Sequence, residues 1–110
     1  MQETVTKNPA ELMKYKDLID TVIEGLNYVN SKLEIGEFDK SIEIFSEMIT
    51  GINTVISGIG HKMNINPHER EEKYLELLVL AYEQADTEKI ILNIDTKLIP
   101  FMREIQTYCY

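Results

Sequence analysis

The chain carries the same short pattern twice. Residues 22–33 and residues 48–59 have isoleucine, glycine, asparagine, valine and serine at matching places, and the remaining inward positions are apolar in both copies. Each copy places a glycine, Gly25 or Gly51, inside a long apolar stretch. Glycine lowers helix stability by about 1 kcal/mol relative to alanine, so its presence here indicates that two helix backbones approach closely. The repeat therefore predicts a pair of closely packed helices.

Apolar residues recur at alternating spacings of three and four, which is the period of one face of an α-helix. No long stretch alternates with the period of two that is typical of strands. Four helices are expected, at about residues 9–34, 38–62, 67–85 and 87–108. Because the links between them are short, we expect an all-α, antiparallel up-down-up-down four-helix bundle.

Several residues predict where these helices begin and bend. Asn8 and Asn66 each precede a proline and stand three residues before a glutamate, which is a strong helix-start pattern. Asp86 or Thr87 can cap the fourth helix. Pro100 lies inside that helix, where it removes one backbone hydrogen bond and is expected to bend the helix.

Length and composition predict one domain in a reducing compartment. The chain of 110 residues is expected to form a single domain over residues 8–110, with residues 1–7 as a flexible N-terminal tail. Its single cysteine, Cys109, has no internal partner for a disulfide. The start lacks the basic and apolar regions of a signal peptide, and the longest uncharged run, residues 48–61, is too short to span a bilayer. We therefore expect a cytoplasmic protein without a membrane anchor.

The net charge of −8 limits the classes of partner. It opposes approach to nucleic acid or to an anionic lipid surface, so neither is expected to bind. The same charge suits a basic protein partner, and it also keeps a small domain soluble.

The sequence contains no pattern typical of catalysis. Neither His61 nor His68 stands three residues after a glutamate, as in di-iron bundles, and the acidic run after His68 has no second histidine for zinc. Both histidines are therefore expected to be exposed to solvent. Cys109 lies at the frayed C-terminal end with no activating partner in the sequence, and the glycines form no nucleotide-binding motif. We expect no enzymatic activity, no metal and no cofactor.

The third expected helix is strongly acidic and carries candidate partner contacts. Its carboxylates are Glu69, Glu71, Glu72, Glu76 and Glu83. They form either a solvated face or a binding patch. Leu80 has Glu76 and Glu83 among its helical neighbours, and Val79 lies at the margin between two faces. An apolar residue with an acidic rim can contact an amphipathic partner helix with basic edges, although isolated exposed leucines are also common.

A secondary stripe on the second expected helix is the other candidate. It consists of Ser41, Ile44, Met48, Gly51 and Val55. Either this stripe receives another helix of the bundle, or it forms an open groove. Ile44, Met48 and Val55, together with Val79, Leu80, Glu76 and Glu83, are therefore the candidate partner-binding residues.

Four segments form a recognisable pattern, at residues 25–28, 36–41 leading to Phe45, 49–52, and 77–86 leading to 98–102. This pattern resembles a family of small, uncharacterised all-helical proteins from bacilli and clostridia. More faintly, the arrangement resembles the flagellar secretion chaperones, which hold an export substrate by its helical tail. Leu77, Leu78, Tyr82, Ala85 and Asp86 follow the rhythm of that family loosely. This second resemblance implies a four-helix protein that binds a partner polypeptide.

Two classes of function follow from these observations. The first is a non-enzymatic helical bundle, similar to an export chaperone or adaptor, that holds an amphipathic partner helix. The alternative is an acidic inhibitor that mimics nucleic acid and binds a basic protein. Self-association into a homodimer would bury the same apolar residues. An enzymatic function would require a stoichiometric metal.

Overall fold

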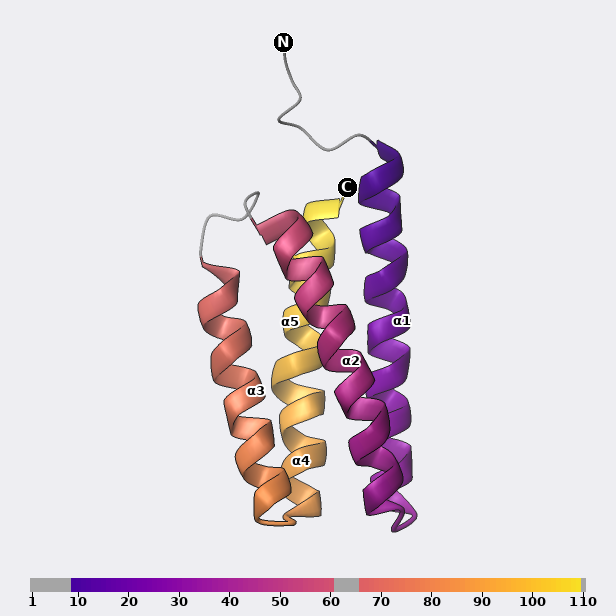
Figure 1. Ribbon diagram of the computed structural model, residues 1–110, viewed down its shortest axis with the longest axis vertical. Coiled ribbons are helices and arrows are strands. Elements are labelled where there is room, and N and C mark those ends of the chain that lie inside the picture. Colours follow the sequence, from indigo (N-terminus) through magenta and orange to yellow (C-terminus); the bar gives the residue numbers. More distant parts are fainter. Residues whose placement is uncertain (1–8, 61–65, 110) are drawn as a thin grey trace.

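The computed structural model describes residues 9–60 and 66–109, and every element within these ranges is helical. Three long helices are α1 (Pro9–Glu34), α2 (Phe38–Ile59) and α3 (Pro67–Glu83). The fourth rod consists of α4 (Thr87–Asn93), the π-helical turn η2 (Ile94–Leu98), α5 (Ile99–Gln106) and the short 3-10 turn η3 (Thr107–Cys109). Figure 1 shows the four rods side by side. The predicted four-helix bundle is therefore confirmed.

The helix boundaries agree with expectation except near two ends. Helix α2 is described to Ile59, while residues 61 and 62 of its predicted range lie outside the described residues. Helix α3 ends at Glu83 instead of residue 85. Ala85 adopts a positive φ of 52°, a left-handed conformation that stops the helix. The predicted N-terminal tail, residues 1–7, lies outside the described residues, as does the predicted cap Asn8.

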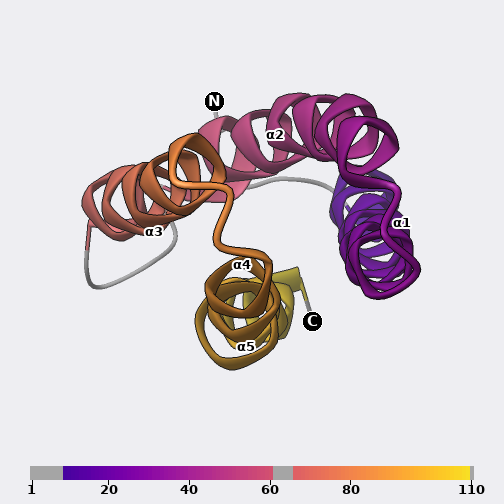
Figure 2. The ribbon, with the colours of Figure 1, turned by 90° about the horizontal axis from the view of Figure 1, so that it is seen from below.

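The four rods occupy the corners of a distorted square when viewed along the bundle (Figure 2). Helix α1 packs along α2 on one side and against α4 and α5 on the other, while α3 packs against α4 and η2. The backbones of α2 and α3 approach each other much less closely. The α2–α3 edge is therefore the loosest edge of the bundle.

The interior is filled by the predicted apolar stripes. Among the most deeply buried side chains are Ile19, Leu26, Ile52, Ile56, Ile59, Leu78, Ile94, Leu98, Phe101 and Ile105. Removing this surface from water is the main favourable contribution to folding. The spacing of Phe38, Ile42 and Phe45 by four and three residues also predicts Ile42 to face inward. This prediction is wrong, because Ile42 is 40% exposed.

The two repeated glycines face each other's helices, as the repeat predicts. Met48 of α2 lies directly over Gly25 of α1, in the space that a Cβ atom would occupy. A Cβ atom on Gly51 of α2 would lie 2.9 Å from Cγ2 of Val22 of α1. Each glycine therefore leaves room for a side chain of the neighbouring helix.

Adding a methyl group at these glycines is expected to have different effects. Gly51→Ala should lower the free energy of unfolding by about 1 kcal/mol, because Val22 is buried and stiff, and overpacking there exceeds the gain in helix propensity. Gly25→Ala should be tolerated, since the flexible Met48 side chain can move aside. Urea unfolding of both variants measures the difference. Equal stability of the two variants would contradict this account of the helix pair.

Local contacts explain how the later helices begin. The Asn66 side chain accepts hydrogen bonds from the backbone N–H groups of His68 at 3.0 Å and Glu69 at 3.4 Å, as predicted for a cap. Asp86, the first of the two predicted candidates, caps α4 by accepting from the Lys89 N–H at 3.1 Å. Both start signals read from these residues are confirmed.

The predicted disturbance at Pro100 takes the form of a π-helical turn. Pro100 has no N–H group to donate, and the turn Ile94–Leu98 lies directly before it. Within the turn, the N–H of Ile99 donates to the carbonyl of Ile94, five residues back. The fourth rod therefore continues as α5 beyond the proline.

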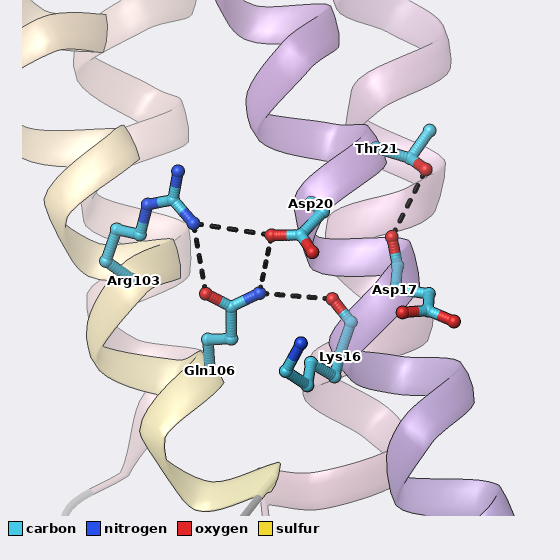
Figure 3. Close-up of polar contacts among 6 residues, drawn as sticks. All are labelled: Lys16, Asp17, Asp20, Thr21, Arg103 and Gln106. Carbon is cyan, nitrogen blue, oxygen red and sulfur yellow. Dashed lines mark hydrogen bonds and ion pairs between the residues drawn. The ribbon is translucent and has the colours of Figure 1, made fainter.

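A polar network joins α1 to α5 (Figure 3). The buried Gln106 side chain donates to the Lys16 carbonyl at 3.1 Å and to Asp20 Oδ1 at 2.8 Å. Arg103 donates to Gln106 Oε1 at 3.1 Å and pairs with Asp20 at 3.3 Å. The hydrogen bond from Gln106 is the largest cause that lowers the pKa of Asp20. The network fixes the position of α5 along α1.

Within the described residues, one helix is long and apolar enough to cross a membrane, judged by length and composition only. This helix is α2, and its core-facing residues Ile52, Val55, Ile56 and Ile59 are buried by the other helices. One such helix is weak evidence for a membrane span.

Candidate functional site

The loose edge of the bundle holds a groove of about 470 Å³. We call it the α2–α3 groove. Its lining residues are Asn53 of α2 and His68, Glu71, Glu72, Leu75, Glu76 and Val79 of α3. The groove therefore lies between α2 and α3, and α3 contributes six of its seven lining residues.

Helices α2 and α3 are held together at both ends of this edge. At one end, the ring of Tyr82 stacks on Phe45 with 5.5 Å between centroids, and its hydroxyl lies 3.1 Å from the Ser41 hydroxyl. At the other end, Pro67 packs against Gly60, where an added Cβ atom would lie 3.1 Å from the proline ring. The middle of the edge carries no such contact among the described residues and remains open as the groove.

The opposite side of α3 is fixed to α5. Arg70 donates to Glu104 at 2.8 Å, and its guanidinium lies 4.7 Å from the centroid of the Phe101 ring. Tyr74 meets the same ring edge-on, with 5.4 Å between centroids. These contacts hold α3 in place, so the wall of the groove has a defined position.

The groove is lined by apolar side chains and by exposed carboxylates. Leu75 is half-buried against the core, and Val79 leaves 47% of its surface exposed. Glu72 and Glu76 are exposed beside them. An apolar strip with acidic edges is complementary to an amphipathic helix with basic edges.

Glu71 is the unusual member of the groove. The residue is only 6% exposed, which is rare for a glutamate without a strong partner. Oε1 lies 3.6 Å from Nδ1 of His68, whereas Oε2 is buried and accepts no hydrogen bond. Burial is the largest cause that raises the pKa of Glu71, and His68 opposes this effect. When Glu71 is ionised, only one of its two carboxylate oxygens therefore has a nearby partner.

The structure places the predicted contact residues in three different environments. Val79 and Glu76 line the groove, while Leu80 and Glu83 are exposed on α3 outside it. Ile44 and Met48 are half-buried and pack on the core, which is the alternative of internal packing for this stripe. Val55 has no exposed surface, so its proposed role as a partner contact is wrong for this structure. The candidate groove therefore includes predicted residues of α3 but none of the secondary stripe of α2.

Sequence reasoning missed Glu71 as a groove residue, because it was grouped with the solvated carboxylates of its helix. The spacing of Glu71, Leu75, Leu78 and Tyr82 is four, three and four, so Glu71 continues the apolar stripe toward the start of α3. This continuation was the signal for its burial. Asn53 gave no such signal, because it enters the groove only through the packing of α2 beside α3.

The structure also places most of the residues considered for metal binding and catalysis. Over residues 9–60 and 66–109, no three histidine, cysteine, aspartate or glutamate side chains gather in a way that could hold a metal ion. His68 is exposed, as expected, whereas His61 lies outside the described residues. Cys109 is buried.

Comparison with protein families decides the family. The model of a domain of unknown function, DUF8042, matches residues 11–108. The chain belongs to the DUF8042 family. The matched span contains every residue of the α2–α3 groove, so the groove is part of the family domain. The expectation of a family without an assigned activity is confirmed. Comparison with curated proteins and with solved structures gives no significant match.

Proposed function

We propose that this DUF8042 domain is a non-enzymatic, cytoplasmic protein-binding bundle from a bacterium. It holds one amphipathic helix of a partner protein in the α2–α3 groove, in the manner of an export chaperone or an adaptor. The observation that supports this function best is the exposed apolar surface of Val79 beside Leu75, with Glu72 and Glu76 along the rim.

The charge of the domain supports a basic partner over a second copy of the same chain. Two domains that meet through this groove would bring carboxylate rims together within a pair of molecules that each carry a net charge of −8. A helix with lysine or arginine along its edges would instead neutralise the rim. We therefore expect a foreign protein partner, with no nucleic acid and no membrane surface involved.

The alternative of a nucleic-acid mimic requires a continuous acidic stripe with little exposed apolar surface. Val79 and Leu80 are each 47% exposed and lie on the most acidic helix. This interruption of the carboxylates favours the binding of an amphipathic helix over mimicry.

Binding of a model peptide tests the proposed function. The probe is a fluorescent peptide of about 15 residues, with leucines along one helical face and lysines along both edges. Val79→Asp is expected to weaken its binding about tenfold, because the aspartate places a charge on the apolar strip. Fluorescence anisotropy in low salt measures the dissociation constants.

Leu80→Asp is the matched control for this measurement. Leu80 is on the same helix and has the same exposed fraction as Val79, but it lies outside the groove. Its substitution should change affinity by less than about twofold. The proposal fails if the wild-type domain does not bind the peptide, or if both substitutions weaken binding equally.

A further inference from the structure

Glu71 differs from the other carboxylates of the groove in a way that points to a specific ligand group. It is nine-tenths buried, and its Oε2 has no hydrogen-bond partner in the described structure. Buried polar groups in native proteins nearly always have a partner, so an unpartnered carboxylate oxygen at a groove requires an explanation. The second buried side-chain oxygen without a partner, Asn30 Oδ1, belongs to an amide whose Nδ2 donates to Asp95 at 2.9 Å. The Asn30 side chain is uncharged, so it does not require a cation.

A positively charged group is the ligand that would satisfy this oxygen. The ionised carboxylate only accepts hydrogen bonds, and lysine and arginine side chains only donate them. Such a charge-assisted hydrogen bond is about twice as strong as a neutral one. His68 already lies near Oε1 at 3.6 Å, so Oε2 is the carboxylate oxygen without a partner. Without a third nearby metal-ligating side chain among the described residues, a metal ion fits this position poorly.

We propose that Glu71 binds one cationic side chain, a lysine or an arginine, of the helix held in the α2–α3 groove. This inference rests on the proposed function, because it names the chemical group that the groove selects in its partner. The apolar strip of Leu75 and Val79 then binds any suitable amphipathic helix, whereas Glu71 distinguishes partners with a cation at the matching position. Selection is effective because a helix without the cation leaves the buried carboxylate unpaired.

Glu71 differs from the exposed carboxylates of the groove in how strongly salt screens its attraction for a bound cation. Glu72 and Glu76 are exposed, so salt screens their attraction for the peptide. Glu71 is withdrawn from water, so its interaction with a bound cation is screened much less. The two kinds of carboxylate are therefore expected to respond differently to ionic strength.

The test compares Glu71→Gln with Glu76→Gln, which remove the same charge from a buried and an exposed groove position. With the lysine-edged peptide, Glu71→Gln should weaken binding about tenfold both in low salt and in about 0.5 M salt. Glu76→Gln should weaken binding about twofold in low salt and leave it unchanged in about 0.5 M salt. Glu71→Gln removes a buried charge and is expected to fold, which its unfolding midpoint verifies.

The possible outcomes separate this inference from the proposed function. If the wild-type domain binds the peptide but Glu71→Gln behaves like Glu76→Gln, the role of Glu71 is overturned and the groove remains a binding site. If the wild-type domain does not bind at all, the groove function and the role of Glu71 are both overturned. A set of peptides with single lysines replaced by norleucine extends the test, since one replacement should abolish the difference between wild type and Glu71→Gln.

Discussion

Replacing Phe101 with alanine is expected to lower the free energy of unfolding by about 3–5 kcal/mol. The ring is 1% exposed, meets Tyr74 edge-on and lies under the guanidinium of Arg70. Its removal leaves a cavity at the place where α3 rests on α5, and it takes a cation–π partner from Arg70. Because small domains have total stabilities of about 5–15 kcal/mol, this loss is a large share of the whole.

Urea unfolding followed by circular dichroism measures this loss. Leu92→Ala is the matched control, because Leu92 is apolar, lies on the same rod and is 59% exposed. It should change stability by less than about 0.5 kcal/mol. A loss below about 1 kcal/mol for Phe101→Ala would show that α3 is not fixed to α5 through this ring. Where the variant still folds, we also expect weaker peptide binding, since the position of the α3 wall depends on Phe101.

Glu71→Gln is expected to raise the stability of the free domain by about 1–2 kcal/mol at neutral pH. The substitution keeps the shape of the side chain and removes the cost of a buried carboxylate with an unpartnered oxygen. Among the groups that act on Glu71, His68 and Glu72 belong to α3, and α2 contributes the uncharged Asn53 to the groove. Functional sites commonly contain residues that lower the stability of the folded domain.

The gain in stability should depend on pH in a defined direction. Burial raises the pKa of Glu71 above its ordinary value of 4.5, so the folded state holds a proton that the unfolded state has already released. As pH rises from the ordinary value through the raised value, the wild-type domain therefore loses stability that Glu71→Gln retains. Unfolding midpoints of both proteins measured from acid to neutral pH should diverge across this window. Parallel curves would contradict the proposed cost of the buried charge.

The helices could be predicted from the sequence because their signals are local. Apolar residues at spacings of three and four predicted the four rods. The Asn66 cap depends only on residues within one helical turn. The π-helical turn before Pro100 could not be predicted in the same way. The proline removes a known hydrogen bond, but the new partner of Ile99, the carbonyl of Ile94, depends on how the whole rod packs.

The candidate site was predictable only in part, since it depends on which helices pack closely. Val79 was expected at a margin between faces, and it lies at the groove. Val55 was expected in a possible open stripe, but α1 approaches α2 so closely that the residue is buried. Conversely, Ile42 was expected inside and is 40% exposed. Single-helix periodicity identifies the apolar faces but does not specify which face receives a neighbour.

Methyl NMR of the wild-type domain during titration with the lysine-edged peptide tests most directly whether the α2–α3 groove is the binding site. Leucine and valine methyl groups can be observed one by one, and Leu75 and Val79 are the apolar residues that line the groove. We expect saturable shifts of these two residues, with little change at Leu92 on α4. Shifts concentrated at Leu92, or no saturable shift at Leu75 and Val79, would contradict the assignment of this groove as the partner-binding site.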